Sequence, residues 1–175
     1  IAAFDANGRP TESSQIGEGD ADSITSIAAG PNGISFAGAT SGTFIHGDPL
    51  GGLDSVIRKL DFDSGVLWSE QFGSAADDEA TAVRIVGKGV YVAGSTAGGL
   101  PEGMPLGESD GFVRKYLPIG TEIWTHQFGT DDYDAVYGMA SDPRGVVVVG
   151  TTHGAFPNQT NAGDRDVFLV KIAFS

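Results

Sequence analysis

The chain contains no cysteine, which excludes disulfide bonds, thiolate metal sites and cysteine nucleophiles. It has only 10 basic side chains against 23 acidic ones, so its formal net charge is −13. A surface of this sign repels nucleic-acid phosphates and anionic lipid, and we expect neither as a partner. No apolar run reaches the roughly 18–20 residues that a transmembrane helix needs, so we expect no membrane span. The lack of cysteine fits the extracellular, periplasmic or cell-surface location that we predict.

Signals for catalysis are also few. The three histidines, His46, His126 and His153, show no metal-ligand spacing. One G-x-S-x-G match occurs, Gly107-Glu108-Ser109-Asp110-Gly111, but it runs into a predicted strand rather than from a strand into a helix, as a nucleophile elbow would. The sequence has no phosphate-binding P-loop and no H-E-x-x-H pair. We therefore expect a non-catalytic protein.

A repeat with a period of 56 residues runs through the 175-residue chain. The motif QIG at 15–17 returns as QFG at 71–73 and at 127–129. Two longer motifs keep the same spacing: GISFAGAT, GVYVAGST and GVVVVGTT begin at 33, 89 and 145, and DSVIRKLD, DGFVRKYL and DVFLVKIA begin at 54, 110 and 166. Because no insertion interrupts this register, each copy is expected to fold in the same way.

Each period holds four strand candidates, which we name A to D in chain order. Short turns of Gly, Pro and Asn join A to B, which predicts antiparallel hairpins. The B strands are apolar on both faces, as in Val146–Val149, and such a strand is buried on both faces. An antiparallel four-stranded unit between its own copies describes a propeller blade. The predicted ranges are A 24–29, 80–85 and 136–141; B 33–40, 89–96 and 145–152; C 54–61, 110–117 and 166–173; D 9–17, 65–73 and 121–129.

At these residues the chain resembles the bacterial β-propeller repeat family known as SBBP. The matching pieces are residues 129–152, the Phe156-Pro157 pair, DVFLVKIA at 166–173 and the W-x-x-QFG segments. The first copy departs from the pattern, because Glu12 stands where the later copies have Trp68 and Trp124. The resemblance implies a propeller architecture on extracytoplasmic bacterial proteins and no single activity.

The predicted fold is all-β, with three four-stranded blades in permuted phase. We divide the chain into a partial blade at 1–17, blades at 18–73 and 74–129, and a partial blade at 130–175. The chain starts at Ile1 rather than Met, and we expect a processed or excised segment. Three blades are fewer than the roughly 4–8 that close a propeller. The expected partners are therefore a second copy, which would close a six-bladed ring, or further blades of a longer parent. A β-trefoil, which closes with three repeats, is the alternative fold.

The alternation of strand direction places the D–A and B–C loops at one end of each blade. The D–A loops are acidic, and binding usually occurs on loops that a rigid scaffold holds. Clustered carboxylates suit Ca²⁺, but an aspartate before a strand also accepts backbone N–H bonds and forms a turn, so both interpretations are open. The candidate metal ligands are Asp20, Asp22, Asp77, Asp78, Asp131, Asp132 and Asp134.

Other repeated residues are interpreted as structural. Asp54, Asp110 and Asp166 open the C strands, where they can pair with a lysine or cap a loop. Trp68 and Trp124 are expected to wedge between blades, although a tryptophan face can also stack on a sugar ring.

The sequence thus predicts an extracytoplasmic scaffold or interaction module, with calcium as a possible cofactor and a protein or glycan as a possible ligand. Two other functions stay open. One is a calcium-dependent hydrolase, similar to propeller phosphoesterases or lactonases, that uses the acidic loops. The other is a carbohydrate-binding lectin module.

Overall fold

The computed structural model describes residues 2–13, 15–17, 21–44, 48–101 and 103–174. Within these ranges the fold is all-β, as predicted, and the described chain contains no helix that could span a membrane. The strands are β1 (Ala2–Phe4), β2 (Pro10–Ser13), β3 (Asp22–Gly30), β4 (Gly33–Thr40), β5 (Asp54–Leu60), β6 (Val66–Phe72), β7 (Asp78–Val86), β8 (Gly89–Thr96), β9 (Asp110–Tyr116), β10 (Glu122–Phe128), β11 (Asp134–Asp142), β12 (Gly145–Thr152) and β13 (Asp166–Ala173).

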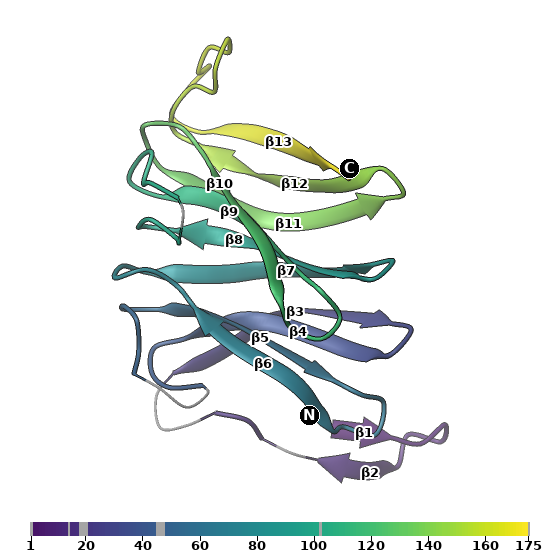
Figure 1. The fold of residues 1–175 in the computed structure, drawn as a ribbon. Coiled ribbons are helices and arrows are strands. Elements are labelled where there is room, and N and C mark those ends of the chain that lie inside the picture. Colours follow the sequence, from purple (N-terminus) through teal and green to yellow (C-terminus); the bar gives the residue numbers. More distant parts are fainter. Residues whose placement is uncertain (1, 14, 18–20, 45–47, 102, 175) are drawn as a thin grey trace.

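These strands form antiparallel sheets in chain order. The first sheet has the order β3-β4-β5-β6, the second β7-β8-β9-β10, and the third β11-β12-β13, while β1 and β2 pair as a separate hairpin. The sheets are stacked on one another, with the β1–β2 hairpin at one end of the stack and the third sheet at the other (Figure 1). Apart from an isolated bridge between Ser109 and Tyr133, the described residues form no pairing between sheets. The described strands therefore form no barrel, which the β-trefoil alternative would need.

The strand pairing repeats with the sequence. A bulge interrupts the first strand of each sheet after Ile24, Ala80 and Val136, which are 56 residues apart. The predicted A strands begin two residues too late, since β3, β7 and β11 each start at the repeated aspartate. These aspartates belong to the predicted D–A loops, but in the structure each one is the first residue of its strand.

The N-terminal hairpin repeats the pairing of β5 with β6. Ala2 lies opposite Ser13 and Phe4 opposite Pro10, as Arg58 lies opposite Ser69 and Leu60 opposite Val66. The shift between the second and third pairs is also at the same place. Residues 2–13 thus pair in the same way as the end of β5 with β6.

Most of the core lies between the sheets rather than within one of them. Ala37 and Ile57 of the first sheet pack against Val83 and Val92 of the second. Val113 of the second sheet belongs to an equivalent cluster with residues of the third. In the second sheet, which has a neighbouring sheet on either side, the central strand β8 is buried on both faces, and this explains its continuous apolar sequence. We call each of these two contact regions a seam.

The bulged strands also join the sheets by hydrogen bonds. The Thr25 hydroxyl donates to the Ala80 carbonyl at 2.6 Å, and the Thr81 hydroxyl donates to the Val136 carbonyl at 2.9 Å. Because the two bonds are one repeat apart, the first-to-second and second-to-third seams are built in the same way.

The connections divide between two ends of the stack. The tight turns, such as β7–β8 and β11–β12, gather at one side of the molecule, and the longer loops gather at the other (Figure 1). One tight turn joins β5 to β6 and contains Ser64, whose φ is 64°. The equivalent residue in the turn between β9 and β10 is Gly120, with a φ of 91°. The left-handed conformation therefore recurs at this repeat position, with serine in one copy and glycine in the other.

Candidate site at the loop end of the sheets

The repeated aspartates are buried where the long loops meet the strands. Asp78 and Asp134 are each 0% exposed. The Asp78 Oδ2 accepts hydrogen bonds from the Ser74 backbone N–H at 2.5 Å and hydroxyl at 2.9 Å. The Asp134 Oδ2 accepts the same pair from Thr130, at 2.6 Å and 3.0 Å. These bonds are those expected of a turn-forming aspartate. Asp22, at the start of β3, is partly buried.

The other predicted metal ligands are scattered along the loops. Asp77 is exposed, and its Oδ1 accepts the Leu53 N–H at 2.9 Å, while Asp132 Oδ1 accepts the N–H of the next residue. Asp131 is exposed, and Asp20 lies outside the described residues. In the described part of the chain, no three acidic or histidine side chains form a group that could hold a metal ion.

The structure brings together two pairs of carboxylates that the sequence analysis did not connect. Asp54, at the start of β5, and Asp78, at the start of β7, both lie against Gly73. The Asp54 Oδ1 and the Asp78 Oδ2 are 2.9 Å and 2.7 Å from the point where a Cβ at this glycine would stand. Asp110 and Asp134 lie against Gly129 in the same way, with their Oδ1 and Oδ2 at 2.5 Å and 2.7 Å from the equivalent point. We call these two sets the carboxylate pairs.

A glutamine holds the first member of each pair. The Gln71 Nε2 donates to Asp54 Oδ2 at 2.7 Å and to the Gly42 carbonyl, while its Oε1 accepts the Phe44 N–H. Gln127 makes the equivalent bond to Asp110 Oδ2, also at 2.7 Å. The QFG motif therefore has three roles: the glutamine ties the B–C loop to the aspartate, the phenylalanine packs on the next sheet, and the glycine leaves room for two carboxylates. Its repetition was the signal in the sequence, but it did not reveal the partners.

The carboxylate pairs are only partly satisfied by hydrogen bonds. Among the described side chains, the buried Oδ1 atoms of Asp54, Asp78, Asp110 and Asp134 have no hydrogen-bond partner. Buried carboxylate oxygens are normally paired with a donor or a cation, because leaving them without one is costly.

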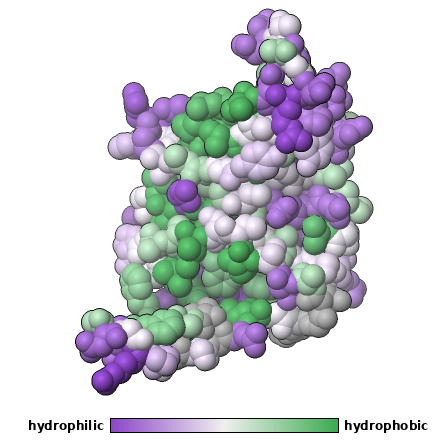
Figure 2. Space-filling model, turned by 180° about the vertical axis from the view of Figure 1, so that it is seen from behind, coloured by the Kyte–Doolittle hydropathy of each residue, from purple (hydrophilic) through white to green (hydrophobic). Residues whose placement is uncertain are grey.

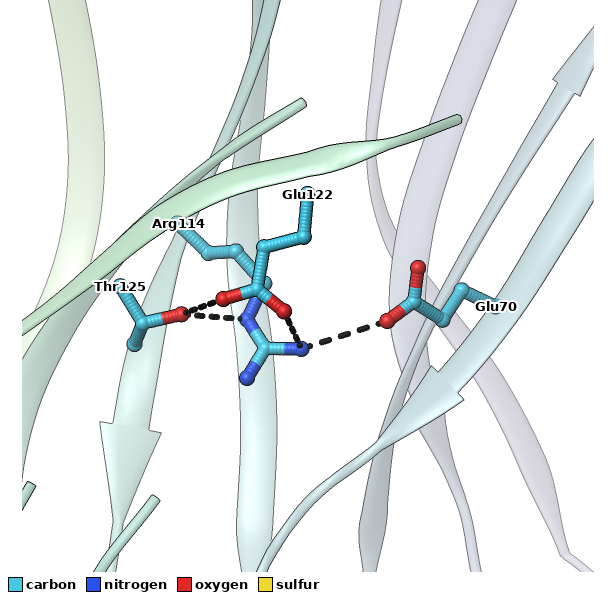
Figure 3. Close-up of polar contacts among 4 residues, drawn as sticks. All are labelled: Glu70, Arg114, Glu122 and Thr125. Atoms are coloured by element: carbon cyan, nitrogen blue, oxygen red, sulfur yellow. Dashed lines mark hydrogen bonds and ion pairs between the residues drawn. The ribbon is translucent and has the colours of Figure 1, made fainter. Parts of the chain in front are cut away.

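A second polar cluster crosses the first seam, and Figure 3 shows it. Arg114 of β9 is 2% exposed, and its guanidinium lies 3.4 Å from Glu70 of the first sheet and 3.4 Å from Glu122 of the second. Its Nε donates to the Thr125 hydroxyl at 2.7 Å, and the group lies 4.0 Å from the centre of the Phe72 ring. The cluster thus joins two sheets through one buried cation.

Burial dominates the electrostatics of this cluster. It raises the pKa of Glu70, and the attraction of Arg114 offsets only part of that effect. The pKa of Tyr116, which lies beside the cluster, is also raised by burial. The Thr125 hydroxyl also donates a hydrogen bond to Glu122 Oε1 at 2.7 Å, so the four side chains in Figure 3 form one network that links the two sheets.

The tryptophans lie at the seams. The Trp68 indole N–H donates to the Pro118 carbonyl of the second sheet at 2.9 Å, and its ring packs against Tyr116 at 5.4 Å. Trp124 packs against Tyr91 and His126 of its own sheet and borders the apolar cluster of the second seam. Trp68 therefore contacts two sheets directly, as the sequence predicts for both tryptophans.

No protein-family model matches this chain, and no curated protein shows significant similarity to it. The functional argument therefore depends on the geometry alone.

Proposed function

We propose that this chain is a scaffold module of propeller blades, which works by stacking with further blades of the same repeat. The extracytoplasmic location and the propeller ring belong to this proposal. Its main support is the exposure of repeat positions that are buried elsewhere in the stack.

The outer face of the third sheet carries the clearest example. Leu169 is 67% exposed, whereas the equivalent Ile57 and Val113 in the first and second sheets are each 0% exposed. Val149 is 40% exposed, although its equivalents are buried alanines. Hydrophobic surface is visible at this upper end of the stack in Figure 2. An uncovered apolar face of this kind is typical of an interaction surface.

The outer face of the first sheet has the complementary exposure. Ile24 and Ile27 are 51% and 63% exposed, but the equivalent Ala80 and Val83 are each 0% exposed. The two outer faces are thus the two halves of one seam, because each seam joins one face of each kind. Head-to-tail stacking of two copies would bury both faces.

The hairpin β1–β2 bears on how such a ring would close. In the first and second sheets, β6 and β10 cover the outer edges of β5 and β9, but no described strand covers the outer edge of β13. β2 is the equivalent of β6, and it already pairs with β1. A second copy can cover β13 with its β2 only if β1 leaves that strand. Blades of a longer parent would need no such exchange.

Sedimentation of the 18.0 kDa chain at micromolar concentration tests the proposal. We expect a particle of twice this mass, and we expect Leu169→Asp or Ile27→Asp to dissociate it. The two substitutions disrupt different outer faces, that of the third sheet and that of the first. In a mixture, the unchanged face of one variant can pack on the unchanged face of the other, so the mixture should form a dimer with one intact seam. A cooperative, stable monomer at all accessible concentrations would refute closure by a second copy.

A further inference from the structure

We propose that each seam holds one divalent cation, with calcium as the fitting ion. The first ion would lie between Asp54 and Asp78, and the second between Asp110 and Asp134. This inference deepens the proposed function, because it names a ligand that fixes one sheet to the next. The first two sites depend only on the stacking within one chain.

The charge of the pairs is the first argument. The four carboxylates are at most 1% exposed, and each keeps a buried Oδ1 without a hydrogen-bond partner among the described side chains. Every ion pair found in the described part of the chain involves other acidic residues. Two close, buried carboxylates repel each other and lose their hydration, so a cation between them removes both penalties.

The geometry of the pairs is the second argument. Over Gly73, the unpaired Asp54 Oδ1 meets the Asp78 Oδ2 that Ser74 holds. Over Gly129, the unpaired Asp110 Oδ1 meets the Asp134 Oδ2 in the same way. The other oxygens of the aspartates are fixed by Gln71, Ser74 and their equivalents, so the carboxylates are held in place before an ion binds. A side chain on either glycine would fill the space between the carboxylates.

The donor type is the third argument. Both pairs offer only oxygen, with no histidine or cysteine among the four residues, and hard cations such as Ca²⁺ prefer oxygen ligands. These sites differ from the calcium site that the sequence predicted on the loops. They keep Asp78 and Asp134, add Asp54 and Asp110, and leave out the exposed Asp77 and Asp131.

Stacking with further blades would create a third site. Asp166 is the equivalent of Asp54 and Asp110 in the third sheet, and Asp22 is the equivalent of Asp78 and Asp134 in the first. The Asp22 Oδ1 is another buried oxygen without a hydrogen-bond partner, and the Asp22 carboxylate lies against Gly17, the equivalent of Gly73. A head-to-tail seam would bring Asp166 of one copy against Asp22 of the next.

Calcium binding by the purified chain tests the inference. Because the carboxylates are buried, the ion must enter during folding or local opening, so the chain is refolded either in chelator or in millimolar calcium. Equilibrium dialysis should find two ions per isolated chain, or three per chain in a closed ring. The melting temperature should rise by at least about 5 °C in calcium at a hundredfold excess over Kd.

Variants assign the ions to the pairs. Asp54→Asn and Asp110→Asn should each lose one ion, and Gly73→Ala should lose the same ion as the first. The control Asp131→Asn removes the same charge from an exposed loop and should keep every ion.

Several results would overturn the inference. One is a wild-type chain that binds no calcium. Another is an Asp54→Asn variant that melts above the wild type whether or not calcium is present, because relief of repulsion alone would then explain it. The third is a folded double variant, Asp54→Asn with Asp110→Asn, that still binds calcium as a monomer or binds more than one ion per chain in a closed ring. A monomer that binds calcium would support the calcium sites and refute ring closure by a second copy. A dimer that binds no calcium would support ring closure and refute the calcium sites.

Discussion

Truncation of equivalent residues in different sheets measures how much each seam stabilises the fold. Ile57 and Leu169 occupy the same repeat position, but Ile57 is 0% exposed and Leu169 is 67% exposed. Removing a fully buried isoleucine side chain to alanine costs about 2–5 kcal/mol, because the apolar contact is lost and a cavity remains. The same change at an exposed position is expected to cost about 0.5 kcal/mol or less.

Urea unfolding, followed by the fluorescence of Trp68 at the same seam, separates these two costs. At a slope of about 2 kcal/mol per molar urea, a loss of 3 kcal/mol for Ile57→Ala lowers the midpoint by about 1.5 M. Leu169→Ala should leave the midpoint nearly unchanged at low protein concentration. It should become costly as the concentration rises, if another copy covers this face.

Two results would refute this reasoning. Equal midpoint shifts at every concentration would show that Leu169 is as buried as Ile57. A shift below about 0.3 M for Ile57→Ala would show that the first seam contributes little to stability. Val113→Ala serves as the matched control in the second sheet, since Val113 is also 0% exposed.

Two further predictions concern the turns and the cluster around Arg114. Ser64→Gly should stabilise the fold by about 0.5 kcal/mol, because the φ of 64° at this residue favours glycine. Gly120→Ser should destabilise the fold, because the new Cβ would stand 2.8 Å from the Trp68 ring. Thermal melts that rank the two variants in the opposite order would contradict the turn geometry. Burial raises the pKa of Glu70 in the folded protein above its ordinary value of 4.5. As pH rises above 4.5, the Glu70 carboxyl therefore loses its proton more readily in the unfolded chain than in the folded protein, and the free energy of unfolding of the wild type falls. Glu70→Gln should therefore gain stability relative to the wild type between pH 4 and 7 in urea unfolding, and a constant difference across this range would contradict the shift.

The strands could be predicted because their signals are local. The repeat of 56 residues and the Gly, Pro and Asn turns gave B strands with the observed bounds, and C and D strands within one residue of them in the second repeat. The predicted A strands start two residues too late, because an aspartate is a turn signal when its burial is unknown. Its burial depends on the neighbouring sheet, which no local pattern describes.

The candidate site could be predicted only in part. The sequence indicated that the acidic repeat positions lie at one end of the sheets, and it included Asp78 and Asp134 among the metal ligands. It could not show that Asp54 lies beside Asp78, because these residues belong to different sheets and meet only when the sheets stack. The exposed Asp77 and Asp131 looked equally suitable as ligands, since the sequence does not distinguish an exposed carboxylate from a buried one.

The sequence by itself determined the repeat, the all-β class and the order of strands, because these follow from periodicity and turn chemistry within each copy. The tertiary structure alone decided which residues face each other across a seam. Stacking buries Ile57 and leaves Leu169 exposed, and it draws two like charges together over Gly73. Those outcomes depend on the free energy of removing side chains from water, which is set by the neighbouring sheet and not by the local sequence.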